Sequence, residues 1–490
     1  MQTPPKPPID LERDDERRFS EVAFEQELER SLGVGGNVLL TLSGISPAAS
    51  VFILGGAALA GFGTGALWGF ALGGVVSVLI ALCYAELSSC FPLAGGDYTL
   101  VSRSLGPACG VAVFFVGLIT LPMSQAIFAL GVADYLRGTV EGVSPLAGGL
   151  VVTVISTAVA CMRMRTNAWV TGAFLMVELA ALTLLTGLGF ANVSHSAADL
   201  VRPQVADGHG GLATLGVAGL VIAVTQGILS QSGYNGSVYF AEETHEPRRA
   251  VAKAVLLSAV ITVTIETIPL AAVLLGSSSW SDILGSDLPV QAFLEQRAGH
   301  ALTTFVLLSM ALAILNANIA FALWSGRMLF AAARDRALPD VLATPLSRVS
   351  KGARMPVAAT IVMGVLSGLC CLLPLTVVVN ATGSTLAVSF GFIAVSAIVA
   401  RARRGEVEGD GFRMPGWPVT PTVALLAIAA IIVIALRDPD QWLSLSIAAG
   451  IVGSGFLYYY TYLRNRTDAT VLLLAGAEDD GDATPVDAGR

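Results

Sequence analysis

The sequence predicts an all-α polytopic membrane protein, and three observations carry that prediction. Of the 490 residues, 54% are hydrophobic and only 13% are charged, whereas soluble domains contain about 25% charged residues. Long apolar runs recur along the chain, and they are continuous rather than alternating, which argues against an outer-membrane barrel. Lysine and arginine gather in every second loop between these runs, which is the pattern of a multi-pass helical protein.

Twelve apolar spans are long enough to be transmembrane helices, each of which needs about 20 residues. They cover residues 34–60, 65–89, 107–134, 145–162, 168–191, 213–240, 252–276, 299–326, 356–376, 380–400, 420–436 and 441–463. Most basic residues fall on the side of the N-terminus if the spans alternate in direction. The positive-inside rule therefore places both termini in the cytosol, and we expect a multi-pass protein of the plasma membrane.

Four regions follow from this pattern. Residues 1–33 form a charged cytosolic tail, and residues 34–400 form a core of ten transmembrane helices. Residues 401–464 hold transmembrane helices 11 and 12, and residues 465–490 form an acidic cytosolic tail that we expect to be disordered. The N-terminus is polar and proline-rich, with no signal peptide, so we expect the first helix to direct insertion.

The first span contains a stretch that is a poor helix, Ser43-Gly44-Ile45-Ser46-Pro47. Gly44 is conformationally permissive, Pro47 lacks a backbone donor, and serine hydroxyls compete with helical hydrogen bonds. Within a bilayer, such a break is tolerated only where protein or a wet cavity satisfies the freed backbone groups. We therefore expect a broken helix 1 whose free groups face a ligand.

The sixth span contains a second such stretch, from Gln231 to Ser237, with two glycines and an asparagine. The two breaks lie in the first span of each successive group of five. Because five is odd, the second group would be inverted relative to the first, which predicts a 5+5 inverted repeat plus two extra helices. Matched broken helices point to the central site of a transporter, although each break could instead be a packing kink.

The two breaks offer groups suited to an amino acid zwitterion. The N-terminal end of the second half-helix presents the N–H groups of Ile45, Ser46 and Ala48, which suit a carboxylate. The carbonyls at 40–42 and 229–232, which end the first half-helices, suit an ammonium. Side chains at this depth that could contact a ligand, or could instead bond neighbouring helices, are Gln125, Tyr234 and Asn235.

Three charged residues are candidates for coupling and gating. Glu178 lies in the middle of the fifth span, where an acid is costly and usually faces the bundle or a water path. It could carry a proton, pair with a substrate amine, or hold a neighbouring helix; for Glu266 in the seventh span we expect the structural role. Glu86 and Arg327 could form a cytosolic gate through ion pairs with Glu242, Glu243 and nearby arginines, or could merely fix the loops.

Several loop motifs resemble those of the amino acid–polyamine–organocation permeases. They are Glu86-Leu87-Ser88-Ser89 followed by Phe91-Pro92 and Ala94-Gly95-Gly96, and Ala241-Glu242-Glu243-Thr244 followed by Pro247-Arg248-Arg249. The resemblance covers about residues 30–465. It implies a ten-helix inverted-repeat core, alternating access, and amino acids or related amines as substrates.

The resemblance also implies specific site residues. Ser43, Gly44, Ile45 and Ser46, with Ser230, Gly233 and Tyr234, match the segments that bind the substrate's backbone groups. Leu229 stands where many relatives have an aromatic lid. Glu178 falls near a position where some proton-coupled relatives keep a lysine, so both positions depart from the family pattern.

We therefore expect a secondary active transporter that moves an amino acid or related small amine by proton symport. The alternatives are an exchanger or polyamine/choline-type carrier on the same scaffold, and a non-transporting membrane sensor. We expect no enzyme, because the four histidines are scattered and no P-loop occurs. We expect no cofactor, metal or nucleic-acid partner, and we read the six cysteines as reduced core residues.

Overall fold

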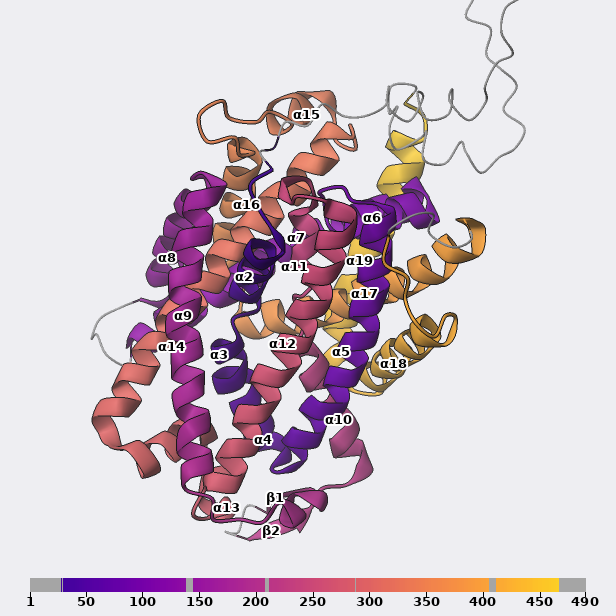
Figure 1. Cartoon of the computed structure of the whole chain (residues 1–490). Helices are drawn as coiled ribbons and strands as arrows, with labels where there is room; N and C mark the ends of the chain where they lie inside the picture. Colours follow the sequence, from indigo (N-terminus) through magenta and orange to yellow (C-terminus); the bar gives the residue numbers. More distant parts are fainter. Residues whose placement is uncertain are drawn as a thin grey trace, which may run out of the picture.

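The helices of the computed structural model run between two opposite ends of the molecule (Figure 1). The structure describes residues 28, 30–137, 144–207, 211–286, 288–404 and 411–466, so the two predicted tails lie largely outside it. One end, here called the α6 end, carries α6 (Asp97–Leu105) and α15 (Asp340–Leu346). The other, the hairpin end, carries the antiparallel strands β1 (Gln204–Ala206) and β2 (Leu212–Thr214) and helix α13 (Trp280–Leu284).

In the described part of the chain, nine apolar helices are long enough to cross a membrane. They are the interrupted segment Val34–Phe62, α5 (Gly65–Cys90), α7 (Pro107–Arg137), α9 (Met164–Ala191), α12 (Pro247–Gly276), α14 (Pro289–Arg334), α17 (Leu375–Arg404), α18 (Val419–Leu436) and α19 (Trp442–Tyr458) with its π-helical extension Tyr459–Leu463.

Three shorter apolar helices fall in the remaining predicted spans. They are α8 (Pro145–Ala160), α10 (Val217–Ser230) and α16 (Val357–Cys370). Each of the twelve predicted spans thus contains an apolar helix, and the all-α class is confirmed. The number of twelve crossings and the inverted repeat remain predictions.

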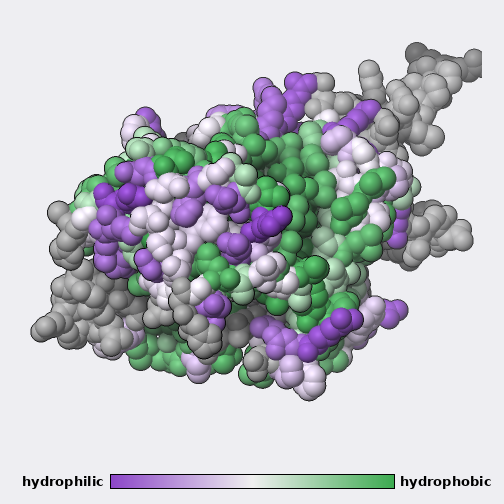
Figure 2. Space-filling view, turned by 90° about the horizontal axis from the view of Figure 1, so that it is seen from below, coloured by the Kyte–Doolittle hydropathy of each residue, from purple (hydrophilic) through white to green (hydrophobic). Residues whose placement is uncertain are grey.

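The outer surface of the bundle is rich in large apolar side chains. Val154 is 68% exposed, Met176 67% and Leu426 64%, and they lie on three different helices. Seen from the hairpin end, hydrophilic residues gather on that end while hydrophobic residues surround them and cover the flank (Figure 2). Apolar patches of this extent mark a surface that faces something other than water, as expected of a multi-pass membrane protein.

The first span is interrupted, as predicted, but by a single residue. Helix α2 (Val34–Ile45) ends at Ser46, whose backbone is left-handed with φ 51° and ψ 71°. A second half-helix follows, built from α3 (Pro47–Ala49), a π-helical stretch at Ser50–Gly55, and α4 (Gly56–Phe62). Pro47 is the first residue of this half-helix, where a missing N–H costs nothing.

The sixth span is interrupted over a longer stretch. Helix α10 ends at Ser230, and helical structure resumes with α11 (Gly236–Tyr239) and a 3₁₀ turn η3 (Ala241–Glu243). Gly233 has φ 108°, and a Cβ atom there would approach the Cγ1 atom of Ile45 to 2.9 Å. The two interruptions therefore pack directly against each other.

Candidate functional site

The carboxyl group of Glu178 lies at the first interruption. Its Oε1 atom accepts a hydrogen bond from the Ala48 N–H (2.8 Å) and another from the Ser46 hydroxyl (3.0 Å). Glu178 is fully buried on α9, and its Oε2 atom has no hydrogen-bond partner in the structure. Helix α9 thus places a carboxyl group at the N-terminal end of the second half-helix, which is the end that favours negative charge.

This geometry corrects one expectation of the sequence analysis. The N–H groups of Ser46 and Ala48 were predicted to be free for a substrate carboxylate. In the structure, the Ser46 N–H donates to the Leu42 carbonyl (2.9 Å) and the Ala48 N–H donates to Glu178. The protein's own carboxyl group occupies the position predicted for the substrate carboxylate, because the glutamate side chain of α9 reaches the first backbone donor after Pro47.

Ser43, one turn before the interruption, holds three helices together. Its hydroxyl donates to the main-chain carbonyls of Leu39 (2.9 Å) and Thr171 (3.3 Å), and the Thr171 carbonyl also accepts from the side-chain amide of Asn316 (3.2 Å). The hydroxyl therefore joins α2 to α9, while Asn316 brings in α14. In this conformation the Ser43 hydroxyl is engaged at the helix interface.

The second interruption is tied to the first through Ser50. The Ser50 hydroxyl lies 3.4 Å from the Ile45 carbonyl and 3.3 Å from the Ser230 carbonyl, which it can serve as donor. The Ser230 hydroxyl in turn donates to Oε2 of Glu266 (2.9 Å) on α12. Glu266, also fully buried, lies close enough to Glu178 for their charges to interact. Two buried acids therefore flank the paired interruptions.

Leu229 ends α10 on the side of α17. Its side chain lies 3.7 Å from the position that a Cβ atom of Gly383 would take, and its carbonyl accepts from the Ser232 hydroxyl (2.7 Å). Leu229 therefore packs toward α17, and its place at the position of the lid remains a prediction.

Asn235 reaches toward the α6 end. Its side-chain amide donates to Oδ1 of Asp97 (3.2 Å), which also accepts from the Tyr84 hydroxyl (2.9 Å). Burial raises the pKa of the Asp97 carboxyl from 3.8 to about 6, and these two hydrogen bonds partly offset that rise. Asn235 thus connects the second interruption to the start of α6, and its amide is engaged within the protein.

Tyr234 and Gln125 are both fully buried. The Tyr234 ring stacks on Phe390 with centroids 6.3 Å apart and meets Tyr84 edge-on at 6.2 Å. Neither polar atom of the Gln125 side chain has a hydrogen-bond partner among the described residues. Its main-chain carbonyl accepts a hydrogen bond from the side-chain amide of Asn318 (3.2 Å). Buried amides rarely stay unpaired, so Gln125 fits a residue that contacts a ligand.

Trp324 of α14 was not anticipated, and it packs against both interrupted helices. Its ring atoms would lie 2.2 Å from a Cβ atom at Gly44 and 2.2 Å from one at Gly236. The indole is almost fully buried and stacks on Tyr239 with centroids 6.1 Å apart. Gly44 is therefore needed for close packing against Trp324. In the sequence, only the glycines at 44 and 236 indicate that a large side chain packs here.

The α6 end carries two ion pairs, one buried and one partly buried. Arg327 binds Glu243 through two hydrogen bonds, of 2.6 and 2.8 Å, and both side chains are almost wholly buried. Arg334 also binds Glu242 through two hydrogen bonds, of 2.7 and 2.9 Å. These pairs fasten α14 to the turn η3 that follows the second interruption.

Glu86 belongs to a different contact from the one expected. It pairs with Arg401 (2.8 Å) and accepts a hydrogen bond from the Met414 N–H (2.8 Å). Arg401 and Met414 lie beyond the ten-helix core in sequence, so Glu86 anchors the connection to α18, whereas Arg327 pairs across the core. The sequence analysis did not include Arg401, since nothing local to Glu86 indicates it.

The start of α2 is attached to the same turn. The N–H groups of Ser31 and Leu32 both donate to the Glu243 carbonyl (3.0 and 2.9 Å). The Asn37 side chain donates to the Ser237 carbonyl (3.2 Å) and to the Thr244 hydroxyl (3.0 Å). The halves of both interrupted helices that face the α6 end are therefore bound to each other.

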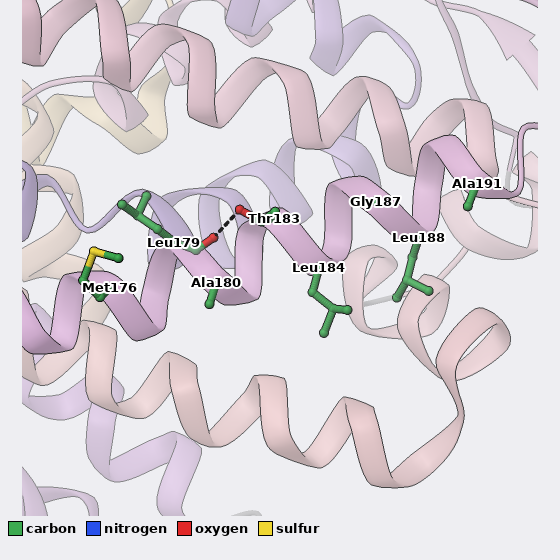
Figure 3. A pocket seen from close by; sticks show the side chains of 8 residues that line it. All are labelled: Met176, Leu179, Ala180, Thr183, Leu184, Gly187, Leu188 and Ala191. Carbon is green, nitrogen blue, oxygen red and sulfur yellow. Dashed lines mark hydrogen bonds between the residues drawn. The ribbon is translucent and has the colours of Figure 1, made fainter.

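A shallow hollow on the outer face of α9 is a different kind of site. Apolar side chains line it, and the hydroxyl of its one polar residue, Thr183, bonds the Leu179 carbonyl at 2.7 Å (Figure 3). It is lined by Met176, Leu179, Ala180, Thr183, Leu184, Gly187, Leu188 and Ala191. Such a surface suits an acyl chain and offers nothing to a zwitterion. In the described ranges no three His, Cys, Asp or Glu side chains are grouped to hold a metal.

A bundle of apolar helices, two of them interrupted at a buried polar centre, defines a multi-pass helical membrane protein. A model of the amino acid permease family matches residues 33–457. The chain therefore belongs to that family, whose members are transporters rather than enzymes.

The similar proteins include mammalian and bacterial transporters. The chain is 27% identical to Asc-type amino acid transporter 1 of Mus musculus over 57% of this chain and 53% of that protein. It is 23% identical to a branched-chain amino acid permease of Bacillus subtilis (82% and 87% covered) and 21% identical to a methylthioribose transporter of the same organism (90% and 95%). The chain thus spans about half the length of the mammalian relative and most of the bacterial ones.

Proposed function

We propose that this protein is a secondary active transporter of an amino acid or related small amine in the plasma membrane, working by alternating access and proton symport. The observation that carries the proposal is the fully buried Glu178 at the interruption of the first span. An acid at such a position in a membrane protein is characteristic of an ion or proton pathway.

The proposed substrate site lies between the two interruptions. It contains Ser43, Gly44, Ile45 and Ser46 on one side and Leu229, Ser230, Gly233, Tyr234 and Asn235 on the other, with Gln125 from α7. The α6 end is assigned to the cytosol, and the pairs of Arg327 and Arg334 with Glu243 and Glu242 form its gate. Glu86 would support that gate indirectly, through Arg401.

Leucine is the first substrate to test, because one relative is named a branched-chain amino acid permease and another a transporter of large neutral amino acids. Purified protein in liposomes should accumulate labelled L-leucine when the interior is made alkaline. Glu178→Gln should lose this accumulation and keep exchange of internal for external leucine. Uptake that ignores the gradient in both proteins would contradict proton coupling.

An amine carrier or exchanger is the second candidate. It is favoured by the aliphatic Leu229 at the lid position and by the two buried acids, Glu178 and Glu266. A ligand-induced thermal-shift screen over amino acids, putrescine, spermidine and choline separates the two. Stabilisation by the amines alone would replace the first candidate with the second.

A further inference from the structure

The protein's own carboxyl group occupies a helix N-terminus in the first span. The half-helix that begins at Pro47 runs through the π-helical stretch into α4, and Ala48 carries its first backbone N–H. That N–H and the Ser46 hydroxyl both donate to Oε1 of Glu178. The second oxygen, Oε2, is buried and has no hydrogen-bond partner in the described structure.

We propose that Glu178 is a resident carboxylate which the substrate's carboxylate displaces, and that the displaced Glu178 takes up a proton. This inference rests on the proposed function and gives it a mechanism. The two donors at Ser46 and Ala48 form one seat, and the seat holds either the protein's carboxylate or the substrate's.

The exchange balances in atoms and charge. The Ala48 N–H and the Ser46 hydroxyl change their acceptor from Glu178 to the substrate carboxylate. Glu178 gains one O–H bond, and its proton comes from water on the open side of the protein. The zwitterion brings no net charge, and the proton neutralises the displaced Glu178, so the site becomes one unit less negative when the substrate binds.

The surroundings of Glu178 make this proton uptake necessary. Two carboxylates held side by side repel each other, so one of them takes a proton. Glu266 of α12 is the other acid beside this site, and the charge of Glu178 acts on it. Helices α2 and α3 contain no titratable residue, and α14 faces α9 at this level through the neutral Asn316. Arg327, the buried cation of α14, is bound to Glu243 at the α6 end.

The test measures proton uptake on binding, with the full chain in lipid nanodiscs. An equimolar mixture of the twenty standard L-amino acids is added in weak buffer with a pH indicator, and the thermal midpoint is followed in parallel. We expect a stabilising shift together with uptake of about one proton per bound molecule. For the amino acid responsible, the affinity should fall about tenfold for each pH unit on the alkaline side.

Three variants separate displacement from other roles of Glu178. Glu178→Gln carries no charge, so the amino acid should bind without proton uptake, independently of pH, and about tenfold more tightly at alkaline pH. Ser46→Gly removes one donor from both carboxylates and suits the left-handed backbone, so affinity should change less than twofold while proton uptake per bound molecule persists. Glu295→Gln, at an exposed position of α14, is the matched control and should behave as the parent.

The outcomes distinguish this inference from the proposed function. Binding without proton uptake in the parent, or unchanged uptake in Glu178→Gln, overturns displacement and leaves amino acid transport standing. A folded Glu178→Gln that no longer binds shows that Glu178 contacts the substrate's ammonium, and it also overturns displacement. If no amino acid stabilises the parent protein, displacement fails together with the amino acid candidate, and only the amine carrier stays open to the amine screen.

Discussion

The indole ring of Trp324 lies between Gly44 and Gly236, and neither position has room for a methyl group. We therefore expect Gly44→Ala to destabilise the protein by about 1–3 kcal/mol, which is the usual cost of overpacking. The measurement is the thermal midpoint of the purified protein. Gly61→Ala, in the same span but with no atom within 4 Å of a Cβ, should be neutral or slightly stabilising.

A second substitution checks that Trp324 is the cause. In a chain that also carries Trp324→Phe, Gly44→Ala should cost less than it does alone, because the smaller ring leaves space for the methyl group. Additive effects of the two substitutions would show that Gly44 is required for another reason.

Asp97 gives a prediction about pH. Its pKa is about 6 in the folded protein against an ordinary 3.8, so the folded state holds the proton more tightly than the unfolded chain does. The contribution of this group to stability is therefore greatest below about pH 4, falls as the pH rises toward 6, and is lost above that. The loss amounts to at most about 3 kcal/mol.

Asp97→Asn removes this titration. The difference in thermal midpoint between Asp97→Asn and the parent should shift in favour of the variant between pH 4 and 6 and then level off. A difference that stays constant across this range would contradict the assignment. The change with pH is the observable, because the amide also alters the contacts with Tyr84 and Asn235.

At the scale of elements, the buried pair Arg327–Glu243 fastens α14 to the turn after the second interruption. Glu243→Gln leaves a buried guanidinium without its counter-charge, so it should cost about 3–5 kcal/mol. The matched control is Asp340→Asn, which removes the acid of the Arg466–Asp340 pair, where Asp340 is 65% exposed. That loss should be much smaller, because solvent screens an exposed ion pair, and equal shifts in the two variants would contradict the burial argument.

The helices and both interruptions were predictable because their causes are local. Continuous apolar runs define the spans, and Pro47 and Gly233 mark the breaks directly in the sequence. The contacts made at those breaks were not predictable in the same way. Glu178 and Ala48 are 130 positions apart, and no local pattern says which of several backbone donors a buried acid will reach.

The charged residues of the proposed gate were likewise predictable, whereas their partners were only partly so. The motif at Glu242 and Glu243 indicated charged residues near arginines, and the structure pairs them with Arg334 and Arg327. Glu86 pairs with Arg401 instead, since the segment after α17 folds back onto the end of α5. The partner of a charged residue depends on how helices far apart in sequence are arranged, which composition and spacing do not determine.

For the whole molecule, the assignment of the α6 end to the cytosol can be tested by chemical labelling. Val341 at the α6 end is 84% exposed and Val201 near the hairpin end is 65% exposed. We expect a membrane-impermeant maleimide to label Val201→Cys in intact cells and Val341→Cys only after permeabilisation. The parent chain gives the background from its own cysteines, and the reverse pattern would invert the topology.

Hydrogen bonds attach α2 and the residues just before it to the segment after the second interruption. Since Ser31, Leu32 and Asn37 bind the residues 237–244, one helix half cannot swing away while the other stays in place. In the proposed transporter, even a small opening here has to break these hydrogen bonds, so intermediate widths are costly. The passage should then be either sealed or fully open, and a membrane that holds this protein should keep its ion gradients while the protein is idle.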